Sequence, residues 1–476
     1  MSKGKKALKV IGIIFGNLIA LIIVVNIILN IVFGIQLCNK IAELKAQGRP
    51  MTIAEIMPPP VPDEENAALL YNKAFILMTT GEGGKPYIPN KESGTENRAI
   101  KIVKEVKSFS DTSQWTDEQK QEISKLVNSR DSQYIYELLE EGSKKSKCNF
   151  NRNYEDGPGT LMPDLSYMRD AIRLLCAKAL LQAESGKTKE AFDTLLIGLK
   201  ISNHLKDGLT LIEQLVRIAC DGIIIECIES ISDSKGITPE QANLIMDELS
   251  AHEGKEPFIK SMDGERVAFG GWIFERIIQG KTSIRELSNI GVEGVEGNEG
   301  KDTFGDRILS PLFLYLYRPI CKKDYICYLT LISKTQDNYN LPYYEYKNNS
   351  EISINQQTEQ LPRYCIFTRM LLPALDRVAE LQARHQAYID ICRTGLALEI
   401  YSAKNGIYPE KLENLVPEFL SEIPIDPFSG ESLIYKKTFN GFILYSLGPN
   451  MKDDGGIDAR ITKWKGDYDI VWESGS

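Results

Sequence analysis

The chain has 476 residues, of which 43% are hydrophobic and 25% are charged, proportions typical of a folded protein. They exclude a mainly disordered chain, a collagen-like chain and a polytopic membrane protein. The 56 lysines and arginines are outnumbered by 65 aspartates and glutamates, so no basic excess is present to neutralise phosphates and nucleic acid is not an expected partner. Three histidines leave little material for histidine-based catalysis or a multi-histidine metal centre.

The first predicted element is a helix long enough to cross a membrane. The 30 residues between Lys9 and Lys40 carry no charge, and a helix of that length reaches about 45 Å, more than the ~30 Å hydrocarbon core of a bilayer. A cleaved signal peptide is the alternative, but its apolar core spans only about 7–15 residues and ends at a small-residue cleavage site. This stretch has no such site. We therefore predict an uncleaved transmembrane anchor over residues 1–39.

The charges around the anchor predict its orientation. Four lysines precede it, whereas the flank after it carries Lys40, Lys45 and Arg49, partly offset by a glutamate. The excess of positive charge before the helix favours a cytoplasmic amino terminus and an extracytoplasmic body. Three polar side chains interrupt the span and are candidates for a face that pairs with another helix, namely Asn17, Asn26 and Asn30.

A proline-rich linker is predicted over residues 40–62. The run MPPPVP at Met57–Pro62 enforces an extended polyproline geometry and stops any helix. Asp63 is then expected to cap a new helix, and Thr116 forms a capping box with Gln119 that opens another. Both signals indicate that the linker leads into helical structure.

Residues 63–345 are predicted to form a helical domain. The stretch Arg173–Ser202 places small and apolar residues at helical spacing on both sides of a glycine, which is weakly tetratricopeptide-like. Because no clear repeat of about 34 residues follows, an irregular bundle is favoured over a repeat array. Further helices are expected at Leu211–Ile231 and at Ile237–Leu249, the second capped by Thr238.

The cysteines of the chain indicate no metal site. They number nine, and they show neither a C-x-x-C pair nor any zinc spacing. Buried free thiols are the expected state. A disulfide between Cys321 and Cys327 remains the alternative, since an extracytoplasmic body would lie in an oxidising compartment.

The remaining ionisable groups of the helical domain have ordinary structural interpretations. Glu265 and Arg266 lie in a helical stretch and are expected to make structural ion pairs rather than a catalytic pair. His252 is predicted at a helix end, where a positive side chain suits the helix dipole. His385 has no acidic or cysteine partner in the sequence around it. The sequence therefore provides no nucleophile–base arrangement.

The chain ends in a predicted α+β unit. A long helix is expected from Pro373 to Ala403, and Gly406 is suited to the left-handed residue that ends it. A short helix in YPEKLENLVPEFL and two strands in ESLIYKK and NGFILYSLG should follow. The whole chain is thus predicted to be α+β and mainly α, with a long carboxyl-terminal helix that leads to a small antiparallel sheet.

The sequence of this last unit resembles that of the globular domain of the major pseudopilin of type II secretion. The matching pieces are ALEIYSAKNGIYPEKLENLV, IPIDPFSGESLIYK, FILYSLGPNMKDDGG and DYDIVW, which lie within residues 371–476. The resemblance implies a pseudopilin-like domain at residues 362–476. The chain departs from the family because its anchor lacks the pilin leader and a large helical domain separates the anchor from this unit, so we expect neither pilin processing nor polymerisation.

The loop after the second of these strands is acidic. Calcium prefers six to eight oxygen ligands, which such a loop can supply, although the spacing is not that of an EF-hand and a solvated acidic turn is the alternative. The pseudopilin family binds calcium in the corresponding loop. The resemblance implies as ligands the carbonyl of Leu447 with Asn450, Asp467 and Asp469, and Asp453 could compensate for the charge that Asn450 lacks where the family has aspartate.

These features predict a single-pass membrane-anchored extracytoplasmic scaffold or interaction protein. A calcium-stabilised carboxyl-terminal loop, a link to type II secretion or envelope assembly, and a protein partner of unknown identity are part of this hypothesis. The alternative is an extracytoplasmic hydrolase that uses carboxylates in a cleft of the helical domain.

Overall fold

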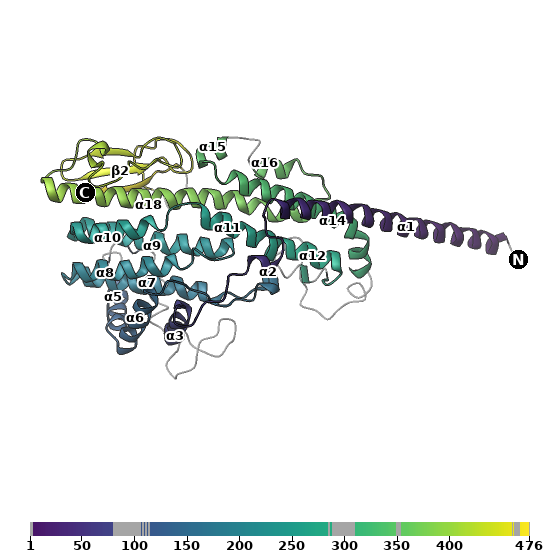
Figure 1. Ribbon diagram of the computed structural model, residues 1–476, viewed down its shortest axis with the longest axis horizontal. Helices are drawn as coiled ribbons and strands as arrows, with labels where there is room; N and C mark the ends of the chain where they lie inside the picture. The colour runs from purple at the N-terminus through teal and green to yellow at the C-terminus, as the bar shows by residue number, and fades with distance from the viewer. Residues whose placement is uncertain are drawn as a thin grey trace.

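The computed structural model describes residues 3–79, 115–283, 310–348, 354–458 and 467–475, together with positions 106, 109, 112, 286, 287 and 460. Within these residues the chain is mainly helical, with one small antiparallel sheet. Figure 1 shows a long body of packed helices, with the sheet near one end and a single helix projecting from the other. The predicted α+β, mainly α class is confirmed at this level.

The projecting helix is α1 (Lys3–Ala46), and its two halves have different surroundings. Every residue from Val10 to Val25 is exposed. In the second half, by contrast, Leu37 and Leu44 are buried in the main hydrophobic core. Among the described helices α1 alone is long and apolar enough to cross a membrane. The helix is therefore an integral part of the body as well as a candidate anchor.

Short helices and hairpins make up the body after the linker. In chain order its elements are α2 (Ile53–Ile56), α3 (Ala67–Thr79), α5 (Asp117–Val127), α6 (Arg130–Ser143), the 3-10 segment η2 (Tyr154–Gly159), α7 (Pro163–Glu184), α8 (Thr188–Asn203), α9 (Leu211–Lys235), α10 (Pro239–Ser250), α11 (Glu256–Gly264), the π-helical segment η3 (Glu265–Gly271) and α12 (Trp272–Gln279). Helices α5 and α10 begin at the predicted caps, Thr116 and Thr238, whose hydroxyls accept backbone N–H groups.

One predicted helix start is wrong. Helix α3 begins at Ala67 rather than directly after Asp63, because Asn66 takes the capping role. The side-chain oxygen of Asn66 accepts the N–H of Ala68, and the same oxygen accepts the N–H of Asn149 from a distant loop. The cap is therefore chosen by a tertiary contact that local sequence does not reveal.

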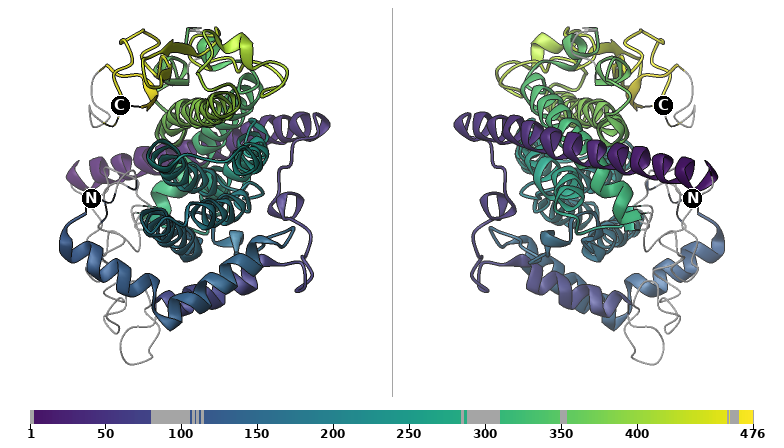
Figure 2. Two further views of the ribbon diagram at one scale, coloured as in Figure 1. Left: turned by 90° about the vertical axis from the view of Figure 1, so that its left-hand side faces the viewer. Right: turned by 90° about the vertical axis from the view of Figure 1, so that its right-hand side faces the viewer.

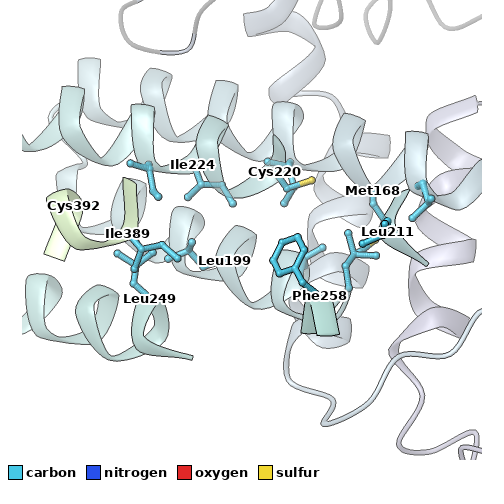
Figure 3. Close-up of a cluster of buried hydrophobic side chains, with 14 of the residues drawn as sticks. Met168, Leu199, Leu211, Cys220, Ile224, Leu249, Phe258, Ile389 and Cys392 are labelled. Atoms are coloured by element: carbon cyan, nitrogen blue, oxygen red, sulfur yellow. The ribbon is translucent and has the colours of Figure 1, made fainter. Parts of the chain in front are cut away.

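Helix α9 lies at the centre of the body. Helices α7 and α8 form the expected hairpin and pack on it, as do α11 and the carboxyl-terminal helix α18 (Pro373–Asn405). Figure 3 shows the apolar contacts around it, made by Cys220 and Ile224 of α9 with Leu199, Phe258 and Ile389 from other helices. Because these side chains come from several different helices around α9, the core forms without a repeated helical hairpin.

A second set of helices leads from the body to the carboxyl-terminal unit. They are α14 (Ser310–Asn338), α15 (Tyr343–Asn348), α16 (Ile354–Glu359) and α17 (Ile366–Leu371). The longest of them, α14, packs along the second half of α1. It carries Cys321 and Cys327, which are free thiols like the other seven cysteines, so the alternative of a disulfide between them is not realised.

The carboxyl-terminal unit consists of a long helix and a sheet packed on it. Helix α18 (Pro373–Asn405) ends at Gly406, whose φ of 76° is the left-handed conformation expected there. Strands β1 (Ile434–Lys437), β2 (Phe442–Ser446) and β3 (Ile470–Ser474) form an antiparallel sheet in the order β1-β2-β3. The short helix predicted between α18 and β1 is only the one-turn 3-10 segment η5 (Leu412–Leu415).

Helix α18 also joins this unit to the body. Its one side meets β2 and β3, where the ring of Trp472 lies so close to Gly395 that a Cβ there would collide with it. Its other side packs on α9 and α10, and the buried residues of all these elements form one continuous core. Figure 2 shows α18 end-on between the sheet and the remaining helices.

Candidate functional site

The acidic loop lies between β2 and β3, and the structure brings part of the predicted ligand set together. The side-chain nitrogen of Asn450 donates to Asp454 at 2.7 Å and to Asp467 at 3.3 Å. Asp469 is buried beside them, and its two oxygens accept the N–H groups of Gly456 at 2.7 Å and of Asp454 at 3.4 Å. Burial raises the pKa of the Asp469 carboxyl.

Of the two other predicted ligands, Asp453 is engaged elsewhere, and Leu447, whose carbonyl is the predicted ligand, is held at the start of the loop through its N–H. Asp453 accepts the Tyr445 hydroxyl at 3.1 Å and the N–H of Gly455 at 2.8 Å. The N–H of Leu447 donates at 3.2 Å to the buried carboxylate of Asp426, which fixes the start of the loop. The position next to Asn450 thus belongs to Asp454 rather than to Asp453.

These residues fit a cation only after one change. The amide of Asn450 now satisfies two carboxylates by donating to them, and a metal would need its oxygen to face the same space. A half-turn of the amide supplies that oxygen and breaks the hydrogen bond that it now accepts from the N–H of Lys452 at 3.1 Å. As arranged, the described residues contain no group of three or more His, Cys, Asp or Glu side chains that could hold a metal. The calcium site therefore stays a prediction.

The loop is also bound to helix α9. Arg460 donates to Asp458 within the loop at 2.7 Å and to Glu229 of α9 at 3.0 Å. Burial raises the pKa of Glu229 to about 7, even though the guanidinium of Arg460 opposes this. Asp233, one turn further along α9, accepts the hydroxyl of Ser474 at 3.1 Å. The sheet and its loop are thus held on the body by side chains of one helix.

A buried cluster that the sequence did not predict lies deeper in the same interface. One carboxylate oxygen of Asp221 accepts from Nδ1 of His252 at 2.9 Å and from Nε2 of His385 at 2.7 Å. Asp221 belongs to α9, His252 follows α10, and His385 belongs to α18. Their exposed fractions are 0%, 0% and 3%. This His252–Asp221–His385 cluster thus links the carboxyl-terminal unit to the centre of the body.

The cluster holds opposite charges next to one another. Burial alone would raise the pKa of Asp221, but the two histidines hold it well below its usual range. Burial alone would lower the pKa of His252, but the charge of Asp221 raises it to about 9. For His385 burial dominates and lowers the pKa. At neutral pH the cluster therefore contains one carboxylate, one imidazolium and one neutral imidazole.

Arg217 lies one helical turn before Asp221 and adds a second positive charge. Its guanidinium is fully buried, 5.8 Å from the ring centre of Phe258, and none of its nitrogens has a hydrogen-bond partner in the part of the chain that the structure describes. Burial lowers the pKa of Arg217, and the charge of Asp221 opposes this shift. The pair Arg217 and Asp221, four residues apart in an apolar run, is the sequence signal that could have revealed the cluster.

A cavity of about 240 Å³ lies where the linker crosses the body, between Met57–Val61 and the start of α9. Arg152 projects into it and forms ion pairs with Asp164 and Glu213. Glu213 also accepts the N–H and hydroxyl of Thr210 at 3.0 and 2.9 Å. The charge of the Glu213 carboxylate is therefore balanced by Arg152, and both of its oxygens accept hydrogen bonds.

Two other potentially reactive groups of this cavity are hydrogen-bonded or protonated. His204 contacts the Tyr71 hydroxyl at 2.8 Å through Nδ1 and the carbonyl of Lys145 at 2.9 Å through Nε2. Burial raises the pKa of the Cys148 thiol to about 12, so it is not a thiolate at neutral pH. Within this cavity, the geometry favours binding over nucleophilic chemistry.

These contacts also place two ionisable residues discussed from the sequence. Arg266 makes a structural ion pair, as expected, with Asp263 and also donates to Gln336, whereas Glu265 accepts the N–H of Leu211 at 3.1 Å. His252 is structural, as expected, but its partner is a buried carboxylate from another helix.

Polar contacts with α14 hold the second half of α1 and the residues just after it. The side-chain nitrogen of Asn26 donates to the carbonyl of Leu316 at 2.9 Å, and Lys322 donates to the carbonyl of Asn30 at 2.9 Å. Arg49 donates to Gln336, which also accepts from Arg266. Asn26 and Asn30 thus mark the predicted pairing face, whereas Asn17 is exposed.

The chain matches no protein-family model, no curated protein and no solved structure. Its function is therefore inferred from its own sequence and geometry.

Proposed function

We propose that this chain is a single-pass membrane-anchored interaction protein whose body lies outside the cytoplasm. The observation that carries the proposal is the division of α1 into an exposed apolar half and a half that belongs to the core of the body. A cut between Leu37 and Ala42, where a signal peptide would have to end, would remove the contacts of Asn26 and Asn30 with α14. An uncleaved anchor keeps them.

The proposed role is to hold the carboxyl-terminal unit away from the membrane. The sheet lies at the end of the body opposite to the free end of α1 (Figure 1). The attachment of α18 to α9 through the His252–Asp221–His385 cluster favours a fixed position for that unit. A link to type II secretion or envelope assembly is supported by the pseudopilin resemblance of this unit alone.

Calcium binding by the acidic loop is a further part of the proposal. It is supported by the convergence of Asn450, Asp454 and Asp467 and by the burial of Asp469 next to them. A bound cation would relieve the repulsion between these carboxylates and stabilise the end of the sheet.

The experiment that tests the proposed topology is a reporter fusion near Met57 in a bacterial host. A reporter that is active only after export should be active at this position, and one that requires the cytoplasm should be silent, because four lysines precede α1. Replacing those lysines with neutral residues should weaken the preference. Activity of the cytoplasmic reporter alone would overturn the extracytoplasmic assignment.

A further inference from the structure

An apolar stripe on the first half of α14 is exposed on the part of the body that the structure describes. Leu312 and Phe313 are 52% and 56% exposed, and Leu316 and Ile320 are 36% and 38% exposed. The spacing of four residues between Leu312, Leu316 and Ile320 places them on one face of the helix. Contiguous apolar exposure of this kind marks an interaction surface in a folded protein.

This stripe lies beside the apolar part of α1. Helices α1 and α14 run in the same direction, since Asn26 contacts Leu316, Asn30 contacts Lys322 and Arg49 contacts Gln336. The start of α14 therefore points toward the free end of α1, as Figure 1 shows.

The length of α1 gives the depth of the stripe relative to a bilayer. From Val10 to Asn30 the helix rises about 30 Å, which equals the thickness of the hydrocarbon core. If the lysines before Val10 mark one surface, Asn30 lies at the other, and Lys322 lies beside it at the headgroups. Leu316, level with Asn26, is then about 6 Å deeper, within the acyl boundary that interfacial helices reach.

The polar residues around the stripe have the charge and the chemistry of a membrane interface. Lys322 and Lys323 lie at the level of Asn30 and Phe33, and the ammonium of Lys323 is 4.9 Å from the Phe33 ring centre. Lysines and tyrosines are enriched at this depth, where the former meet anionic headgroups and the latter span the polar boundary. Tyr315 occupies such a position, one residue before Leu316.

We infer that the first half of α14 is a second membrane contact, which inserts Leu312, Phe313, Leu316 and Ile320 into the outer boundary of the bilayer next to α1. This inference rests on the proposed anchor. Its consequence is a fixed orientation of the body, because a single helix permits rotation about its axis and two contacts do not. The bilayer covers the stripe, and no second protein is required.

The test is photo-crosslinking of the full chain in vesicles of phosphatidylcholine and phosphatidylglycerol. Phe313→benzoylphenylalanine is a conservative replacement that reports what touches this side chain. Ile19→benzoylphenylalanine in the exposed half of α1 is the control for the anchor. Thr330→benzoylphenylalanine is the control for water, because Thr330 is exposed on the same helix about 12 Å beyond Lys322.

The inference predicts lipid adducts at positions 19 and 313 that exceed those at position 330 several-fold, as measured by mass spectrometry. Lipid adducts at 19 without any at 313 would overturn the second contact and leave the anchor intact. Adducts between 313 and a second copy of the chain would show that the stripe is a dimer interface and would also overturn it. Absence of lipid adducts at 19 would contradict the anchor itself.

Discussion

The two ends of this chain are attached to the same helical body in different ways. The carboxyl-terminal helix α18 carries buried residues from Leu375 to Ile400, and its polar contact with the body, between His385 and Asp221, is enclosed. The amino-terminal helix α1 is held by polar contacts at Asn26 and Asn30 and by Arg49 just after its end, whereas every residue from Val10 to Val25 is exposed. The difference shows that α18 completes the core, whereas the first half of α1 leaves its apolar side chains exposed.

The largest effect is expected from removal of the charge at the centre of the carboxyl-terminal attachment. Asp221→Asn removes the buried carboxylate next to His252 and Arg217 and leaves Glu248, 3.8 Å from Nε2 of His252, as the remaining acidic neighbour of that histidine. Breaking a buried ion pair in this way costs about 3–5 kcal/mol. Denaturant unfolding of the purified chain measures this loss. Asp247→Asn is the matched control, since Asp247 is exposed on α10 and should change stability by less than about 0.5 kcal/mol. Equal losses in the free energy of unfolding for both variants would show that the His252–Asp221–His385 cluster does not stabilise the attachment of α18.

A pH titration should separate the contribution of His252. Its pKa is raised to about 9 in the folded protein, against about 6.5 in an unfolded chain. The stabilisation is therefore fully present below pH 6.5 and is lost as the pH rises through 9, by up to about 3 kcal/mol. His252→Gln should flatten this part of the profile. A wild-type profile that rises between pH 7 and 9 would contradict the assignment of charge within the cluster.

Calcium should stabilise the same end of the molecule if the acidic loop binds it. At a free concentration of 100 times Kd the gain is about 2.7 kcal/mol, and it should appear as a higher Tm of the full chain with calcium than with chelator. Asp469→Ala should abolish most of the difference. Asp453→Asn should retain it, because Asp453 is bound to Tyr445 and Gly455 instead. Identical Tm values with calcium and chelator would identify the loop as a solvated turn.

The smallest effect is expected at the amino-terminal attachment. Asn26→Leu removes one hydrogen bond between α1 and α14, and such bonds within membranes contribute about 0.6 kcal/mol on average. Asn17→Leu is the matched control, because Asn17 is exposed and should leave the stability in detergent unchanged. A larger loss for Asn17→Leu than for Asn26→Leu would place the pairing face of α1 elsewhere.

The sequence predicted the parts of this fold that depend on local patterns. The long apolar helix α1, the N-caps at Thr116 and Thr238, helix α18 and the strands β1 and β2 all follow from periodicity and end signals. The start of α3 was misplaced because a distant loop selects Asn66 as its cap.

The candidate sites show the same difference between local patterns and contacts that are distant in sequence. The contacts of Asn450 with Asp454 and Asp467 lie within one loop, so composition drew attention to them. The partner of His385 lies 164 residues away in sequence, and no local pattern relates two such positions. The buried pair Arg217 and Asp221 was the available hint, since charges inside an apolar helix need partners from elsewhere.

The central claim is that α1 remains attached as a membrane anchor. Mass spectrometry of the intact protein, extracted from membranes after an alkaline wash, measures its mature amino terminus directly. The account predicts a terminus upstream of Val10 in the membrane fraction, because the second half of α1 belongs to the core of the body. A mature terminus between Leu37 and Ala42 in the soluble fraction would contradict it, since α1 would then be a signal sequence.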